Sequence, residues 1–132
     1  MSHLDAQTAE QMKQTPMYQS YVRVAPRPQD WTVLCTKLGV MFRQDYDWSE
    51  DVAKIKSPVL LTFGDADALR TANAAQFFEL LGGRKDGGWD GSGMSNARLA
   101  ILPGTTHYSI FSSPLLATVV AQFLDAPLMA AK

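Results

Sequence analysis

The sequence has one cysteine, no long apolar run and almost no excess of charge of either sign. Cys35 has no partner for an internal disulfide, and no signal peptide opens the chain, which together favour a reducing cytoplasm. The longest apolar stretches are a few residues each, far short of the roughly 18 that cross a bilayer, so no membrane partner is expected. Twelve Lys/Arg against thirteen Asp/Glu give a formal charge of -1, which argues against nucleic acid as a partner.

What the sequence does contain is enough apolar material for a folded core. The chain has 132 residues, of which 46% are hydrophobic and 19% charged. This composition is typical of a globular protein and excludes a disordered tail or a fibre. The length predicts a single domain over residues 1–132.

Residues 1–50 show helical periodicity and no strand pattern. From Pro28 to Gln44 apolar residues recur every three or four positions, which predicts an amphipathic helix. A shorter helix is expected from Pro16 to Val24, where the following Pro-rich stretch ends it. The first fourteen residues are compatible with a helix that frays.

Residues 55–126 show a different pattern, in which short apolar runs alternate with helical periodicity. Together with the helical first part, this predicts an α/β fold with a short parallel sheet and a right-handed crossover. The expected elements are a strand at 58–63 that ends at Gly64 and is buried on both faces, a helix at 71–81, a strand at 98–102 that ends at Pro103-Gly104, and a helix that begins at Ser113-Pro114 and runs to about Leu124.

A glycine-rich stretch interrupts the second part of the chain. The segment from Gly82 to Gly93 holds six of the nine glycines and is expected to be a surface loop. Its carboxylates Asp86 and Asp90 do not have the spacing of a calcium-binding EF-hand loop. We therefore expect neither a metal nor a cofactor there, and none is indicated elsewhere in the sequence.

Two ionisable residues follow the two predicted strands. Asp67 belongs to the string Gly64-Asp65-Ala66-Asp67 after the first strand, and His107 follows the second strand in Pro103-Gly104-Thr105-Thr106-His107. Because the carboxyl ends of neighbouring parallel strands meet at one edge of a sheet, Asp67 and His107 are expected to be hydrogen-bonded. A carboxylate beside a histidine fixes the tautomer of the imidazole, which is the orienting half of a Ser-His-Asp triad.

The same residues resemble the C-terminal part of the α/β-hydrolase superfamily. That superfamily has a strand followed by Gly-x-x-Asp, matched by Gly64 and Asp67, and later Pro-Gly-x-x-His, matched by Pro103, Gly104 and His107. The chain order, acid before histidine, also agrees. The resemblance implies that Asp67 and His107 are the triad acid and histidine.

The resemblance covers residues from about 55 to the end by motif, and residues 1–50 only by their likeness to lid helices. The Gly-x-Ser-x-Gly nucleophile elbow is absent, because Gly91-Ser92-Gly93 lies in the glycine-rich loop without a strand before it. The resemblance therefore implies a partial hydrolase, acting on esters or related C–O substrates, that has little or no turnover alone. It would be a fragment, a truncated gene product or one half of a split enzyme whose nucleophile is carried by a separate chain.

A second class of function stays open, a non-catalytic oligomeric binding module on a hydrolase-derived scaffold. Each site residue also has a structural interpretation. Asp67 would cap the helix that begins near Thr71, Asp65 would be a turn residue, and His107 would be an ordinary loop histidine.

Other candidate residues are better explained by packing. Cys35 lies on the apolar face of the first long helix and is expected to be a core residue rather than a nucleophile. Trp31, Trp48 and Tyr108 are candidates for an acyl pocket, although core packing is the commoner role of such aromatic residues.

The first strand also predicts self-association. Residues 59–63 are apolar and uncharged, and they would leave unpaired N–H and C=O groups along one edge if no further strand were present. Since a two-stranded parallel sheet is too small to be stable alone, we expect a homodimer through this edge. The alternative is that the helical first part covers the edge.

Overall fold

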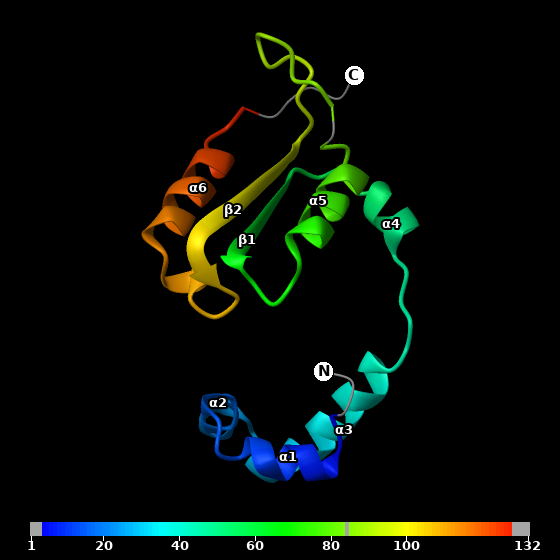
Figure 1. Cartoon of the computed structure of the whole chain (residues 1–132), viewed down its shortest axis with the longest axis vertical. Helices are drawn as coiled ribbons and strands as arrows, with labels where there is room; N and C mark the ends of the chain where they lie inside the picture. The colour runs from blue at the N-terminus through cyan, green and yellow to red at the C-terminus, as the bar shows by residue number, and fades with distance from the viewer. Residues whose placement is uncertain (1–3, 84, 128–132) are drawn as a thin grey trace. The chain divides into compact units, whose positions relative to one another are not determined.

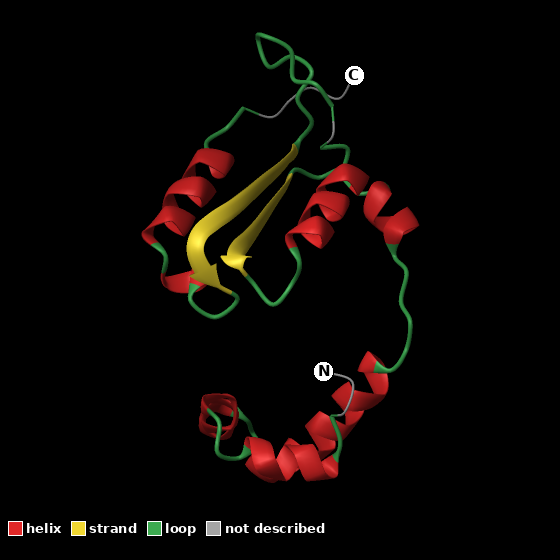
Figure 2. Ribbon diagram, in the orientation of Figure 1, coloured by secondary structure: helices red, strands yellow, loops and turns green. Residues whose placement is uncertain are grey.

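The computed structural model describes residues 4–83 and 85–127, and the chain divides into two compact units, Met1–Asp47 and Trp48–Lys132. The first unit contains helices and the second a strand-helix-strand-helix arrangement (Figures 1 and 2). The α/β fold with a short parallel sheet is thus confirmed. That residues 1–132 form one domain stays a prediction. In the described part of the chain, no helix has the length and apolar character needed to cross a membrane.

In its described residues, the first unit has three α-helices and one short 3₁₀ turn. Polar side chains cap the first two helices, because Asp5 accepts a hydrogen bond from the Thr8 N–H at 2.8 Å and Thr15 accepts one from the Tyr18 N–H at 3.4 Å. The helix expected at 28–44 begins with the 3₁₀ turn and ends at Phe42. The elements are α1 (Ala6–Met12), α2 (Pro16–Val24), η1 (Pro28–Asp30) and α3 (Trp31–Phe42).

The core of the first unit lies between α1 and α3. Ala9, Trp31 and Cys35 are buried, and the Trp31 indole N–H donates a hydrogen bond to the Ala9 carbonyl at 2.8 Å. That carbonyl is one of those at the end of α1 that have no partner within the helix, so the indole satisfies a buried acceptor. The rings of Tyr18 and Tyr21 pack on Trp31 at 5.3 and 5.1 Å between centroids.

Replacing Trp31 by Phe tests this anchor. Trp31→Phe leaves the Ala9 carbonyl without its donor and should lower the free energy of unfolding by about 2 kcal/mol, in the range for an unsatisfied buried group. Trp89→Phe is the control, because Trp89 is fully exposed and its replacement should cost less than about 0.5 kcal/mol. Urea unfolding followed by circular dichroism measures both, and equal losses would contradict the anchoring role.

The second unit is a pair of parallel strands with a helix on either side (Figure 2). The strands pair from Val59 opposite Ala97 to Gly64 opposite Leu102, and both α5 and α6 contact the two strands. The elements are α4 (Ser49–Ala53), β1 (Val59–Ala66), α5 (Thr71–Leu80), β2 (Ala97–Thr106), η2 (Ile110–Ser112) and α6 (Pro114–Leu124). The short helix α4 has no counterpart among the predicted elements.

Both strands run past the residues that were expected to end them. β1 continues through Gly64 to Ala66, and β2 continues through Pro103-Gly104 to Thr106. The register shifts between Gly64 and Ala66, since Ala66 is paired with Thr106. Gly104 has a φ of 66°, so this glycine lets β2 bulge and rejoin the ladder instead of ending it.

β1 is less buried than the sequence predicts. Val59 to Phe63 are half-buried rather than covered on both faces, and only Gly64 of this strand is buried. The buried apolar residues of the second unit come from α5, β2 and η2, namely Ala74, Ala97, Leu102 and Ile110. The physical reason is the width of the sheet, because each strand has a neighbour on one side only.

The close approach of the strands at Gly64 can be tested by adding one methyl group. A Cβ at Gly64 would collide with the carbonyl group of Thr105, so Gly64→Ala should lower the free energy of unfolding by about 3 kcal/mol. Gly104→Ala is the control. Its Cβ would meet no atom within 4 Å, and the positive φ alone should cost about 1 kcal/mol. Urea denaturation measures both, and a Gly64→Ala loss no larger than the control would show that no close contact exists.

Candidate active site

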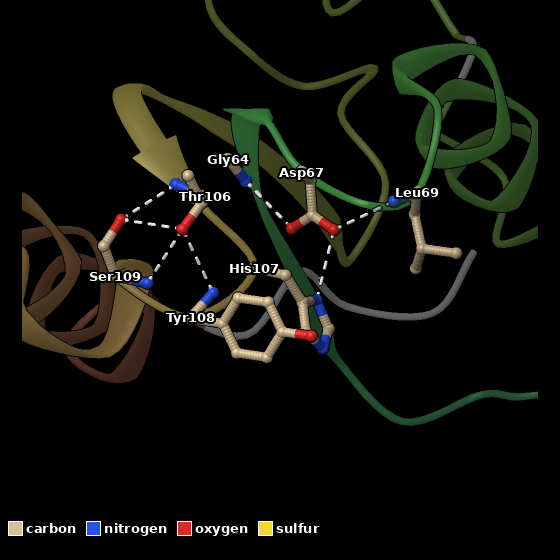
Figure 3. A network of polar contacts seen from close by, with 7 residues as sticks. All are labelled: Gly64, Asp67, Leu69, Thr106, His107, Tyr108 and Ser109. Carbon is tan, nitrogen blue, oxygen red and sulfur yellow. Dashed lines mark hydrogen bonds and ion pairs between the residues drawn. The ribbon is translucent and has the colours of Figure 1, made fainter. Parts of the chain in front are cut away.

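The carboxyl ends of β1 and β2 bring Asp67 and His107 together. Asp67 follows Ala66 at the end of β1, and His107 follows Thr106 at the end of β2. The His107 Nδ1 atom lies 3.1 Å from the Asp67 Oδ1 atom (Figure 3). The expected neighbourhood of these two side chains at one edge of a parallel sheet is therefore confirmed, whereas their catalytic role stays a prediction.

The Asp67 carboxylate is buried and accepts several hydrogen bonds. Its side chain is 4% exposed. Oδ1 accepts the backbone N–H of Leu69 at 3.0 Å, and Oδ2 accepts that of Gly64 at 3.4 Å (Figure 3). These backbone donors, the Leu69 N–H first, together with His107 hold the pKa of the Asp67 carboxyl below its ordinary value, although burial acts in the opposite direction.

An ionised Asp67 determines which nitrogen of His107 carries the proton. A carboxylate only accepts hydrogen bonds, so the Nδ1 atom of His107 must be the donor. The neutral ring then carries its lone pair on Nε2, the form in which histidine is a general base. The His107 side chain is 53% exposed and hence accessible to a reactant. Asp67 does not cap α5, whose N-cap residue is Arg70.

Asp65 also joins the two strand ends. The sequence suggested a turn residue, but Asp65 lies within β1, and its Oδ1 atom accepts the Thr105 N–H at 3.2 Å. The backbone N–H groups of Gly104 and Thr105 lower the pKa of the Asp65 carboxyl. This contact joins β1 to the bulged part of β2 at Thr105, two residues before His107.

The turn that carries His107 is closed by Thr106 and Ser109. The Thr106 N–H donates to the Ser109 hydroxyl at 2.9 Å, and the Ser109 N–H donates to the Thr106 hydroxyl at 3.1 Å (Figure 3). The Tyr108 N–H also donates to the Thr106 hydroxyl at 3.3 Å. Sequence reasoning did not identify these positioning residues, although a Thr and a Ser on either side of a loop histidine are a recognisable signal.

A small hollow of about 110 Å³ lies beside the pair. It is apolar except for Thr62 and the two site residues, and its volume is well below the roughly 300–1,000 Å³ of complete small-molecule pockets. A hollow of this volume, formed by this chain alone, would hold only a small group such as a short acyl chain. The lining residues are Thr62, Phe63, Asp67, Leu69, His107, Ile110, Phe111 and Leu116.

The first unit contains a larger hollow, of about 690 Å³, whose lining has no charged side chain and no histidine that could act as an acid or a base. Its lining includes Trp31 and Cys35 and no carboxylate, histidine or basic side chain. Cys35 is buried, and burial raises the pKa of its thiol, which confirms the core interpretation over a nucleophile. Trp31 is likewise a core residue, whereas Trp48 and Tyr108 are exposed and line neither hollow.

The glycine-rich segment is a loop, as expected, in its described residues 82–83 and 85–93. Asp86 accepts the Gly88 N–H and Asp90 accepts the Ser92 N–H, each at 2.9 Å, so both carboxylates organise local turns. Ser92 lies in this loop and not between a strand and a helix. Within the described ranges, no three histidine, cysteine or carboxylate side chains are grouped so as to hold a metal ion.

The lowered pKa of Asp67 predicts a pH dependence of stability. Because the folded state favours the ionised carboxyl, this stabilisation is complete above the ordinary pKa and is lost as the pH falls through the folded value. Asp67→Asn removes this stabilisation. The difference in free energy of unfolding between the native chain and the variant should therefore become smaller as the pH falls from 7 to acid values. A difference that stays constant or widens on acidification would contradict the assignment.

A direct titration separates the contribution of His107. In a ¹³C titration, His107→Ala should raise the pKa of the Asp67 carboxyl only part of the way to its ordinary value. The Leu69 N–H, which lowers this pKa most, remains in the variant. Tyr108→Ala is the control, since the Tyr108 ring contacts His107 but is not among the groups that shift the pKa of Asp67.

Comparison of the chain with protein-family models, curated proteins and solved structures found no match in any of the three.

Proposed function

We propose that residues 55–126 supply the acid, Asp67, and the general-base histidine, His107, of a hydrolase resembling the α/β-hydrolases. The proposal is supported chiefly by the 3.1 Å contact between Nδ1 of His107 and a buried carboxylate at the carboxyl edge of a parallel sheet. The substrate class would be an ester or a related C–O compound. In the reaction, Asp67 orients the imidazole and stabilises the imidazolium that forms, and Nε2 of His107 accepts the proton of the attacking group.

The attacking group is the missing component in the described residues. Within them, the polar partner of the His107 ring is Asp67, and the nearby Ser109 hydroxyl is bonded to Thr106. A triad without its nucleophile loses about a millionfold in turnover. A general base alone contributes about a hundred- to ten-thousandfold, so the chain alone should be a weak catalyst at best. We propose that a separate chain carries the nucleophile.

Hydrolysis of p-nitrophenyl acetate tests the role of the pair. We expect a slow rate above buffer that is lost in His107→Ala and lowered about tenfold or more in Asp67→Asn, because the wrong tautomer then predominates. His3→Ala, at the chain's other histidine and outside the described residues, is the control and should retain the rate. Equal rates for the native chain and His107→Ala would refute the general-base role.

Labelling with a fluorophosphonate tests the second half of the proposal. This reagent reacts with activated serines, so the isolated chain should show no rapid stoichiometric labelling. Fast labelling of any serine, Ser92 included, would show that the nucleophile lies within this chain and that no second chain is required.

The alternative function is a non-catalytic oligomeric binding module. It is favoured by residues 59–63 of β1, which are half-buried and carry no charge, as is typical of a strand that pairs with a further strand. A chain that associates but shows no difference between native and His107→Ala rates would support this alternative. For either function we propose a reducing cytoplasm, because the cysteine is a free thiol in the core of the first unit.

A further inference from the structure

The backbone of β1 presents two residues to the open side of the sheet. The Val59 N–H donates to the Asn96 carbonyl at 3.3 Å, so Val59 faces β2, and alternate residues of β1 face it as well. Leu60, Thr62 and Gly64 therefore direct their N–H and C=O groups away from β2. At Gly64 both groups are used, since its N–H donates to the Asp67 carboxylate and its carbonyl accepts the Asp67 N–H at 3.3 Å. Leu60 and Thr62 have no such partner within the described residues.

The outer edge of β2 is different, because side chains occupy it where the strand begins. Ala97 faces outward, and its N–H donates to the Ser95 hydroxyl at 3.2 Å. Its carbonyl accepts the Arg98 guanidinium at 2.8 Å, and Arg98 also contacts the Ser95 carbonyl. Charged side chains of this kind prevent an edge from adding a strand. Between Val59 and Phe63, β1 has no charged residue and no such side-chain cap.

We propose that β1 pairs antiparallel with β1 of a second copy, in the register centred on Leu61. In this register Leu60 lies opposite Thr62 of the other copy, and each of the two symmetric pairs exchanges both N–H···O bonds, four in all. The two Leu61 side chains then lie directly across from each other on one face, as a cross-strand apolar pair. The resulting sheet has four strands. This inference does not depend on the catalytic role proposed for Asp67 and His107.

The charges around β1 favour a second copy in the antiparallel direction. Lys54 and Lys56 precede the strand, and Asp65 and Asp67 lie at and beyond its end. Antiparallel pairing centred on Leu61 places Lys56 of each copy opposite Ala66 of the other, next to the exposed residue Asp65. A parallel arrangement would instead place like charges together. Two-fold pairing also covers the β1 edge of both copies at once, as closed symmetry requires.

The proline before β1 and the glycine near its end define where this pairing stops. In the proposed register Pro58 lies opposite Gly64 of the other copy. Pro58 has no N–H to donate, and the outward groups of Gly64 are already bound to Asp67. The added strand therefore forms its hydrogen bonds at Leu60 and Thr62 without disturbing the Asp67 carboxylate.

Sedimentation velocity on matched proline variants tests the proposal. The native chain at about 10 µM should sediment as a dimer of the 14.5 kDa chain. Leu60→Pro removes one outward N–H from each copy and should weaken dimerisation at least about a hundredfold, by the loss of two intersubunit bonds. Leu99→Pro is the control, because Leu99 faces outward on the other edge of the sheet. It should leave the dimer intact.

Two further measurements keep the proposal testable if a proline variant fails to fold. Amide hydrogen exchange of Leu60 and Thr62 should slow as the concentration of the native chain rises, while that of Leu99 and Ile101 should not change. Lys56→Glu should weaken the dimer about tenfold at low salt and less at high salt, whereas Lys85→Glu, the same change in the glycine-rich loop, should have no effect.

Three results would overturn the inference. A native chain that sediments as a 14.5 kDa monomer at this concentration would exclude the dimer. A dimer that withstands Leu60→Pro but is lost in Leu99→Pro would place the interface on β2. Concentration-independent protection of Leu60 and Thr62 in a monomer would show that another segment of the same chain covers the edge.

Discussion

The geometry of the second unit depends on the carboxylate of Asp67. Its Oδ1 atom binds the Leu69 N–H and the His107 ring, and its Oδ2 atom binds the Gly64 N–H. The first contact turns the chain from β1 towards α5, the second orients the imidazole, and the third occupies the outer edge of β1. One buried acceptor thus joins the end of a strand, a loop and a histidine, which is why its ionisation is favoured in the folded state.

The approach of the two strand ends is possible because β1 has no side chain at Gly64. Any Cβ there would meet the Thr105 carbonyl, so only glycine allows β2 to pass this closely. Asp65 binds the Thr105 N–H across the same gap, and the bulge at Gly104 absorbs the extra residues of β2. The backbone position of His107 is therefore set by these contacts at the end of β2, whereas its ring, bonded to Asp67, is half exposed.

These contacts explain how much the sequence could predict. Helical periodicity and the Pro-rich stretch that follows placed α2 at Pro16–Val24, and the order of strands and loops brought Asp67 and His107 to one edge. The strand ends were wrong because Gly64 and Pro103-Gly104 are usual stop signals, and only the paired strand shows that they form a close contact and a bulge. The Leu69 and Gly64 donors arise from backbone directions that residue types do not reveal, whereas the Thr and Ser around His107 are a signal for the turn that they close. The short helix α4 lacks a periodic pattern long enough to recognise.

The edge of β1 and the candidate site meet at Gly64, and the two oxygens of Asp67 keep them apart. A strand that paired as far as Gly64 would compete with Oδ2 for its N–H, remove one of the donors that stabilise the carboxylate and raise the pKa of Asp67. A strand that ends its hydrogen bonds at Thr62 leaves that donor, and the Oδ1 contact with His107, in place. Association through β1 and proton transfer at His107 are therefore compatible in the register centred on Leu61, and the side chain that orients the histidine is also the one that limits the edge.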